Sequence, residues 1–208
     1  MSKVKIVHQL ELTWKPHHLH ANSGEVILLS GKNGSGKTLW LNRIAGLEPL
    51  PEQMHILVNQ QAVTKQPLRM LFEGWPTIWL GQTIAEELTF GLPQQVEKEL
   101  ITHTLARWRI PELEMETETA TLNRLQSLRL NLASMDLAAP MVALLDNPTD
   151  ALAVEDGAQL INDITAWAHE SKTIVVVTSN RWQDWQQQAS QHWQTSSTST
   201  LPQLRGTA

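Results

Sequence analysis

A glycine-rich loop near the start of the chain carries the clearest chemical signal in the sequence. The loop fits the pattern G-x-x-x-x-G-K-[ST] of phosphate-binding loops, and it reads Gly31-Lys32-Asn33-Gly34-Ser35-Gly36-Lys37-Thr38. Because glycine has no Cβ, the backbone of such a loop can turn its N–H groups toward phosphate oxygens. Lys37 can place its charge near the β- and γ-phosphates, and the Thr38 hydroxyl can ligate Mg²⁺. The loop therefore predicts a nucleotide-binding site that also takes Mg²⁺.

The segments on both sides of the loop match the strand and the helix that such a loop needs. Residues 25–30 are apolar and partly β-branched, which is typical of a buried strand. Residues 39–47 carry apolar side chains at a spacing that suits a helix packed on a sheet. The N-terminus of that helix would add partial positive charge beside the phosphates. A glycine-rich turn without a ligand is the alternative, and the flanking pattern favours nucleotide binding.

The composition excludes several other classes of function. A net charge of −5 over 208 residues does not indicate a nucleic-acid-binding surface. The chain has no cysteine, which excludes disulfides and thiolate sites and is typical of a cytoplasmic protein. No apolar stretch is long enough to span a bilayer, and residues 1–5 lead into a strand-like run instead of a signal peptide. Any association with a membrane is therefore expected to depend on a partner.

Alternating strand and helix patterns predict an α/β fold. Residues 4–14 suit one or two antiparallel strands, residues 14–20 a connecting loop, and residues 94–139 a helical subdomain inserted in the sheet domain. Further strands are expected at residues 25–30, 55–59, 68–72, 141–146 and 173–178. We expect a single P-loop NTPase domain with a mainly parallel sheet over residues 1–194, followed by a disordered tail over residues 195–208.

Three segments resemble the ATP-binding-cassette (ABC) ATPases. Residues 144–149 read Leu-Leu-Asp-Asn-Pro-Thr and are similar to the family's L-L-D-E-P-T, and residues 41–47 are similar to L-x-x-x-A-G-L. Residues 83–92 resemble the T-V-x-E-E-x-x-F-G-L segment of the cobalt and energy-coupling-factor branch. The resemblance implies an ABC-type fold, with N-terminal antiparallel strands and a helical insertion, and it implies ATP and Mg²⁺ as cofactors.

The resemblance also implies partners. In this family two subunits, identical or different, enclose two ATP molecules head to tail, and membrane-spanning subunits hold them at the inner face of the membrane. Trp75 and Trp79 lie where the family meets its membrane subunit, and packing against the helical subdomain is the alternative. No nucleic-acid partner is expected.

Roles for residues outside the loop follow from the same resemblance. Asp146 would hold Mg²⁺ through its water shell, and Glu73 stands where the family has the Gln that senses the γ-phosphate, with Gln82 as an alternative. Trp14 is the candidate for stacking on the adenine, with a core position as the alternative. The expected cofactor contacts are Gly31, Lys32, Asn33, Gly34, Ser35, Gly36, Lys37, Thr38, Leu39 and Trp14, and the expected metal contacts are Thr38, Asp146 and Glu73.

The signature loop departs from the family. In place of L-S-G-G-Q the sequence has Leu122-Asn123-Arg124-Leu125-Gln126, so both glycines are replaced. Leu125 brings a Cβ to a point where the backbone of the family approaches the γ-phosphate. Arg124 could still offer charge and Asn123 an amide donor, but a purely structural helix start is the favoured interpretation.

The hydrolytic residues depart as well. Asn147 replaces the Glu that polarises the attacking water, Ser179 replaces the switch His, and residues 150–153 lack their usual closing Asp. An amide cannot accept the proton of the attacking water, and the loss of a positioned general base costs about 10²–10⁴-fold in rate. We therefore assign no catalytic residue. The family's catalytic Glu, His and Gln positions are occupied here by Asn147, Ser179 and Glu73.

Three hypotheses follow from this pattern. The leading one is an ATP-binding subunit of a transporter-like ABC complex, with weak or absent hydrolysis. The second is a working transporter ATPase that uses Glu73 or residues of a partner in place of the missing ones. The third is a nucleotide-independent scaffold that has kept the fold, against which the intact loop argues.

Overall fold

The chain forms two compact units. The computed structural model describes residues 8–14, 17–74, 77–92, 96–110, 114–196 and 203–207. The first unit comprises residues 1–72 and 141–208, and we call it the sheet unit. The second comprises residues 73–140, and we call it the helical unit.

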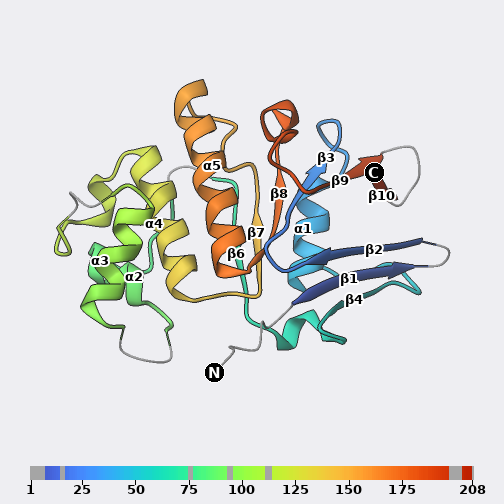
Figure 1. Cartoon of the computed structure of the whole chain (residues 1–208), viewed down its shortest axis with the longest axis horizontal. Coiled ribbons are helices and arrows are strands. Elements are labelled where there is room, and N and C mark those ends of the chain that lie inside the picture. The colour runs from blue at the N-terminus through green and yellow to red at the C-terminus, as the bar shows by residue number, and fades with distance from the viewer. Residues whose placement is uncertain are drawn as a thin grey trace. The chain divides into compact units, whose positions relative to one another are not determined.

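The sheet unit is built on a six-stranded, mainly parallel sheet (Figure 1). Its strands, in their order across the sheet, are β10 (Gln203–Thr207), β9 (Gln191–Ser196), β3 (Val26–Ser30), β8 (Ile174–Thr178), β7 (Val142–Leu145) and β6 (Leu68–Leu71). Neighbours from β9 to β6 are parallel, whereas β10 is antiparallel to β9. Every residue of β3, β7 and β8 is buried, as expected for central strands of a parallel sheet. The predicted fold class is confirmed.

A second sheet contains antiparallel strands only. Its order is β2 (His17–Asn22), β1 (Gln9–Trp14), β4 (His55–Val58) and β5 (Gln61–Ala62). The predicted loop over residues 14–20 is wrong, because β2 pairs with β1 along its whole length. Leu19 and Ala21 lie opposite the buried Leu12 and Leu10. This apolar alternation outweighs the polar His20 between Leu19 and Ala21 and the two histidines that begin the strand.

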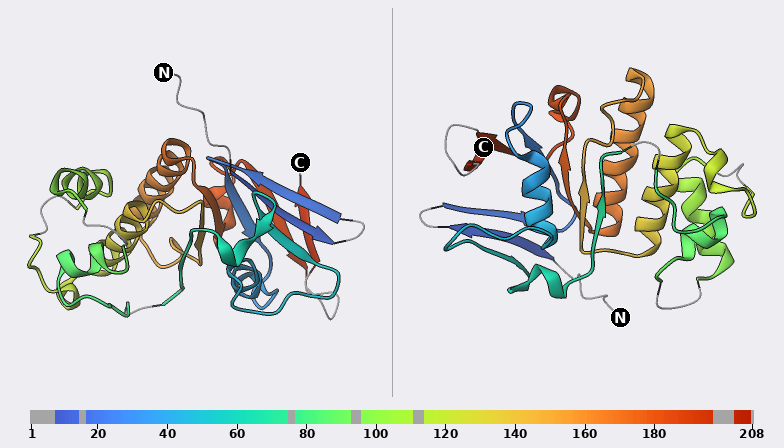
Figure 2. Two further views of the ribbon diagram at one scale, coloured as in Figure 1. Left: turned by 90° about the horizontal axis from the view of Figure 1, so that it is seen from below. Right: turned by 180° about the vertical axis from the view of Figure 1, so that it is seen from behind.

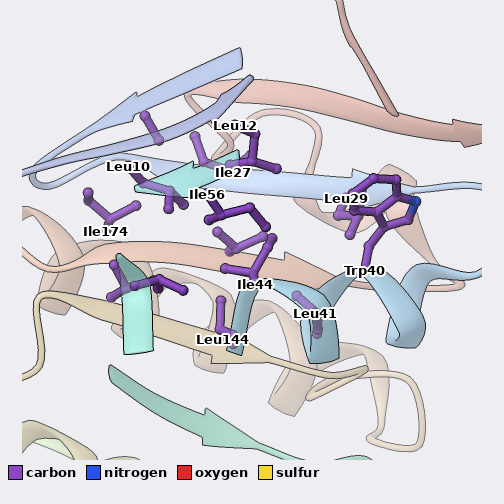
Figure 3. Packing of buried hydrophobic residues seen from close by; sticks show 14 of the residues in the cluster. Leu10, Leu12, Ile27, Leu29, Trp40, Leu41, Ile44, Ile56, Leu144 and Ile174 are labelled. Carbon is purple, nitrogen blue, oxygen red and sulfur yellow. The ribbon is translucent and has the colours of Figure 1, made fainter. Parts of the chain in front are cut away.

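The core of the sheet unit lies between the two sheets and helix α1 (Lys37–Ala45) (Figure 3). Helix α1 contributes Trp40, Leu41 and Ile44 to this core. The antiparallel sheet contributes Leu10, Leu12 and Ile56, and the parallel sheet contributes Ile27, Leu29, Leu144 and Ile174. The helix ends at Gly46, which adopts a left-handed conformation with φ 76° and donates its N–H to the Arg43 carbonyl. The core thus fixes the helix that follows the glycine-rich loop.

The long helix α5 (Val154–Ser171) covers the other face of the parallel sheet, opposite α1 (Figures 1 and 2). Its apolar positions recur at helical spacing. The buried members are Leu160, Ile161, Ile164, Trp167 and Ala168. Two helices on opposite faces explain why the central strands carry no exposed side chains.

The helical unit contains α2 (Ile84–Thr89), α3 (Lys98–Arg107) and α4 (Arg124–Leu137). Asp136 on α4 accepts hydrogen bonds from Arg107 (3.0 Å) and from the indole N–H of the buried Trp108 (3.2 Å), which joins the end of α3 to α4. At the start of α2 the Glu86 N–H donates to Thr83 Oγ1 at 3.3 Å, which is one half of a capping box. The unit begins at residue 73, earlier than the expected residue 94, because it also includes α2.

The end of the chain differs from the prediction of a disordered tail. Residues 195 and 196 complete β9, and residues 203–207 form β10, which pairs antiparallel with β9. The low apolar content suggested disorder, but residues 195 and 196 continue a strand that is parallel to β3, and they find their own backbone partners in β10. The remaining residues of the predicted tail, 197–202 and 208, lie outside the described part of the chain.

Candidate nucleotide-binding site

Three neighbouring strands of the sheet unit end at one edge of the parallel sheet. The glycine-rich loop follows β3, Asp146 follows β7, and Thr178 is the last residue of β8, which lies between them. Leu29 of β3 is in register with Thr178, and Leu145 of β7 is in register with Val177. The fold therefore brings the loop and Asp146 to the same sheet edge, where ligands of α/β proteins bind.

The loop leads directly into α1. Gly34 and Gly36 have φ values of 76° and 91°, which a side chain would disfavour, and Gly36 is the N-cap of the helix. Lys37 is only 7% exposed, and its Nζ donates to the Gly31 carbonyl at 3.2 Å. Thr38 is exposed at the first turn of the helix. The exposed loop backbone and the helix N-terminus together are suited to a phosphate group.

Asp146 is buried and held in one orientation. It is 2% exposed, and its Oδ1 accepts a hydrogen bond from Thr178 Oγ1 at 2.6 Å. The backbone N–H of Asn147 donates to the same threonine oxygen at 3.0 Å. Sequence reasoning missed Thr178, because no motif marks the strand that separates the loop from Asp146.

These residues fit a magnesium ion that arrives with a nucleotide. Mg²⁺ is usually bound through one or two carboxylates or hydroxyls, several waters and the phosphates of the substrate. The exposed Thr38 hydroxyl and the Asp146 carboxylate are oxygen donors of that kind. Within the described residues no group of three or more His, Cys, Asp or Glu forms a closed metal site. The donor set therefore suits a metal carried by phosphate and not a resident metal.

Ser179, which stands where the resemblance places the switch histidine, is engaged in hydrogen bonds of its own. Ser179 is fully buried, and its Oγ donates to Asp150 Oδ1 at 2.6 Å. Asp150 Oδ2 also accepts the Asn180 N–H at 2.8 Å, and Arg181 donates to the Leu152 carbonyl at 3.2 Å. These bonds tie the loop after β7 to the loop after β8. Sequence reasoning included Asp150 only as part of the loop over residues 150–153 and did not predict its bond to Ser179.

The helical unit carries the remaining candidates. Glu73 and Gln82 are exposed, so the role of Glu73 at the metal stays a prediction. Asn123 and Gln126 form a capping box at the start of α4, with hydrogen bonds of 3.0 and 3.1 Å. This local use of Asn123 and Gln126 supports the interpretation that the replaced signature is a structural helix start. Trp79 is partly buried.

Trp14 ends β1, packs against the core and lies beside Trp40. The two ring centroids are 6.5 Å apart with the planes tilted by 35°, and Arg43 lies 5.0 Å from the Trp40 ring centroid. This internal contact supports the core interpretation of Trp14, and stacking on adenine stays a prediction. Trp75 lies outside the described residues.

Two side chains of strand β9 form hydrogen bonds at the glycine-rich loop and at Ser30, the residue before it. His192 Nε2 lies 2.5 Å from Ser30 Oγ, and the His192 ring stacks on Trp182 with the centroids 5.7 Å apart. On the loop itself, Ser35 Oγ lies 2.6 Å from Thr195 Oγ1. Sequence reasoning missed both β9 residues, because no strand was predicted at His192 and Thr195 fell in the predicted disordered tail.

The stability of the fold should fall as the pH drops through about 6.5. Burial lowers the pKa of His192 and of His8 below the ordinary histidine value of about 6.5. Below that pH the unfolded chain therefore binds more protons than the folded chain, and the free energy of unfolding decreases. Thermal unfolding between pH 8 and pH 5.5 measures the effect. His192→Gln should weaken this pH dependence, and an unchanged dependence would contradict the assignment to His192.

Comparison with known proteins agrees with this geometry. A family model described as ABC transporter matches residues 14–150, well over half of the chain. The chain belongs to this family. The match runs from Trp14 to Asp150 and so contains the glycine-rich loop, Asp146 and the whole helical unit. Family membership, inferred from three short segments of sequence, is confirmed.

Individual members of the ABC family match over most of the chain. The histidine/lysine/arginine/ornithine transport ATP-binding protein HisP of Escherichia coli is 31% identical over 186 residues, covering 77% of this chain and 72% of HisP. The energy-coupling factor transporter ATP-binding protein EcfA1 of Streptococcus agalactiae is 28% identical over 169 residues, covering 76% of this chain and 60% of EcfA1. Relatives therefore include the energy-coupling-factor branch and amino-acid transport.

Solved structures share the fold. The cbiO1 protein of Clostridium perfringens, part of the ABC transporter complex cbiONQ, superposes with a TM-score of 0.75 at 16% identity. The match covers 89% of this chain and 83% of cbiO1. In the described part of the present chain, no helix has the length and apolar character needed to cross a membrane.

Proposed function

We propose that this chain is the ATP-binding subunit of an ABC transport complex that binds ATP with Mg²⁺ but hydrolyses it weakly or not at all. The observation that carries the proposal is the combination found at one sheet edge. The glycine-rich loop is complete and Asp146 is oriented by Thr178, whereas the residue after Asp146 is an asparagine. The chain thus retains the groups that hold a nucleotide and lacks the group that would activate water.

Binding follows from the chemistry of the loop. The N–H groups of residues 31–38 surround the phosphates, and Lys37 exchanges its bond to the Gly31 carbonyl for phosphate oxygens. Thr38 would supply an oxygen ligand to Mg²⁺, and Asp146 would hold the ion through its water shell, while Glu73 stays a predicted metal contact. The bound metal would neutralise part of the phosphate charge.

Weak hydrolysis follows from the residues that replace the catalytic ones. The Asn147 amide cannot take a proton, and the missing general base lowers the rate by about 10²–10⁴-fold. Ser179 carries no charge with which to contact the γ-phosphate, and its hydroxyl is already bonded to Asp150 inside the protein. The replaced signature Leu122–Gln126 would serve the ATP of a partner poorly, because its backbone cannot approach phosphate as glycine does.

The proposed surroundings are those of the family. A second ABC-type subunit would complete each nucleotide site, and membrane-spanning subunits would hold the pair at the cytoplasmic face of the membrane. HisP and EcfA1 are named as ATP-binding proteins of transporters, and cbiO1 is part of a transporter complex. These relatives support a role in transport and leave the substrate open.

Nucleotide-dependent stabilisation tests the proposal. Adding ATP with Mg²⁺ at about 100 times Kd should raise the free energy of unfolding by about 2.7 kcal/mol, seen as a rise in Tm. ATP turnover measured on the same sample should stay close to background. An unchanged Tm would instead favour the nucleotide-independent scaffold, and fast turnover would favour the working ATPase that uses Glu73. Turnover in the assembled complex tests the form of that ATPase that uses a partner's residues.

A further inference from the structure

Strand β9 contacts the phosphate-binding loop and the strand residue before it, with side chains on both faces of the sheet. It is parallel to β3, with Ser30 in register with Gln194. Successive strand residues point to opposite faces. His192 accordingly reaches Ser30 on one face, whereas Trp193 packs into the core on the face of α1 and Thr195 follows it on that side. Thr195 therefore lies where the loop leaves β3.

The Thr195 hydroxyl connects the start of the loop to its middle. Its Oγ1 donates to the Ser30 carbonyl at 3.1 Å and lies 2.6 Å from Ser35 Oγ, so Ser35 is the donor of the second bond. Both hydroxyl-bearing residues are buried, with Thr195 4% and Ser35 3% exposed. One side chain thus ties the last residue of the strand to a residue five positions further along the chain.

The backbone of Gly31 packs against the same pair of residues, Thr195 and Ser35. A Cβ built on Gly31 would collide with Thr195 Oγ1 and Ser35 Oγ and would come within 2.9 Å of the Thr195 carbonyl. The backbone at Gly31 therefore rests directly on Thr195. A glycine is needed here because the loop lies against β9, in addition to any approach of phosphate to the loop.

We propose that Thr195 is a positioning residue for nucleotide binding, which holds the phosphate-binding loop in its binding conformation before the nucleotide arrives. A loop that is already ordered loses less conformational freedom on binding, so its affinity is higher. The inference rests on the proposed ATP binding and adds a residue that no loop motif contains. Thr195 itself is buried beneath the loop and would not touch the nucleotide.

Thr195→Val tests the proposal, because valine keeps the shape of the side chain and removes the hydroxyl. We expect the Kd for ATP with Mg²⁺ to rise by about 3- to 10-fold, the range that corresponds to one or two neutral hydrogen bonds. Thr195→Ser retains the hydroxyl and should restore near-normal affinity. Thr173→Val is a matched control, since Thr173 is also buried and hydrogen-bonded but lies at the opposite end of β8. It should lower Tm without changing the Kd.

A second variant keeps the test decisive if Thr195→Val folds poorly. Ser35→Ala removes the Ser35–Thr195 bond from the loop side and leaves the Thr195 bond to the Ser30 carbonyl in place. The double variant should bind ATP no more weakly than Thr195→Val alone, because Thr195→Val already removes the bond to Ser35. Binding is measured by calorimetry well below Tm. If wild-type protein and Thr195→Val bind ATP with equal Kd, the role of Thr195 is overturned and the proposed function stands. Wild-type protein that does not bind ATP would overturn the function itself.

Discussion

ATP hydrolysis should increase by about 10²-fold or more when Asn147→Glu is combined with Ser179→His and Asp150→Ala. Glutamate would supply the missing general base, whose contribution in enzymes is about 10²–10⁴-fold. Asp150 must change together with Ser179, because its carboxylate accepts the Ser179 hydroxyl and the Asn180 N–H and so holds the buried serine in place. Steady-state phosphate release measures the gain.

The partial combinations separate the contributions. Asn147→Glu alone should give part of the increase, since it restores the base without the second charged contact. Ser179→His alone should give little, because the larger side chain meets a fully buried position beside Asp150. If the triple variant binds ATP but hydrolyses it no faster than wild type, Asn147 does not limit the rate, and the defect lies in the replaced signature Leu122–Gln126.

Loss of the Lys37 ammonium should weaken ATP binding by about 10- to 100-fold in Lys37→Ala. Hydrogen bonds to charged groups contribute about 1.5–3 kcal/mol each, which corresponds to that range of affinity. In the structure Lys37 is 7% exposed and folds back onto the Gly31 carbonyl, so its charge is already held at the loop. Calorimetric titration with ATP and Mg²⁺ measures the Kd.

A matched control distinguishes local from general charge effects. Lys98→Ala removes the same charge from an exposed position at the start of α3 in the helical unit. It should leave the Kd unchanged. Equal losses of affinity in the two variants would mean that the nucleotide responds to the overall charge of the protein, and the assignment of Lys37 to the phosphates would be wrong.

The parts of the site that sequence could predict are those carried by contiguous residues. The glycine-rich loop and the apolar run ending in Asp146 each occupy only a few neighbouring positions, and the structure brings them to one sheet edge as expected. The central strands could be predicted for the same reason, because burial on both faces leaves a continuous apolar run such as residues 174–177.

The supporting residues could not be predicted, because their roles arise from contacts between distant segments. Thr195 bonds to Ser35 across 160 positions, and Thr178 bonds to Asp146 across 32 positions. A serine- and threonine-rich stretch with few apolar residues looks disordered, but Thr195 and Ser196 pair with β10 and continue a strand that is already paired with β3. Asp150 was noted only as part of a loop that lacks its usual acid, and only the fold reveals that it binds Ser179.

The fate of bound ATP tests the central claim most directly. The purified chain is mixed with a substoichiometric amount of radiolabelled ATP and Mg²⁺, and the bound nucleotide is recovered and identified over time. We predict that the chain retains the label as ATP for many minutes, because the loop binds it and Asn147 cannot activate water. Conversion of the bound ATP to ADP at about 1 s⁻¹ or faster, an ordinary enzymatic rate, would contradict the account.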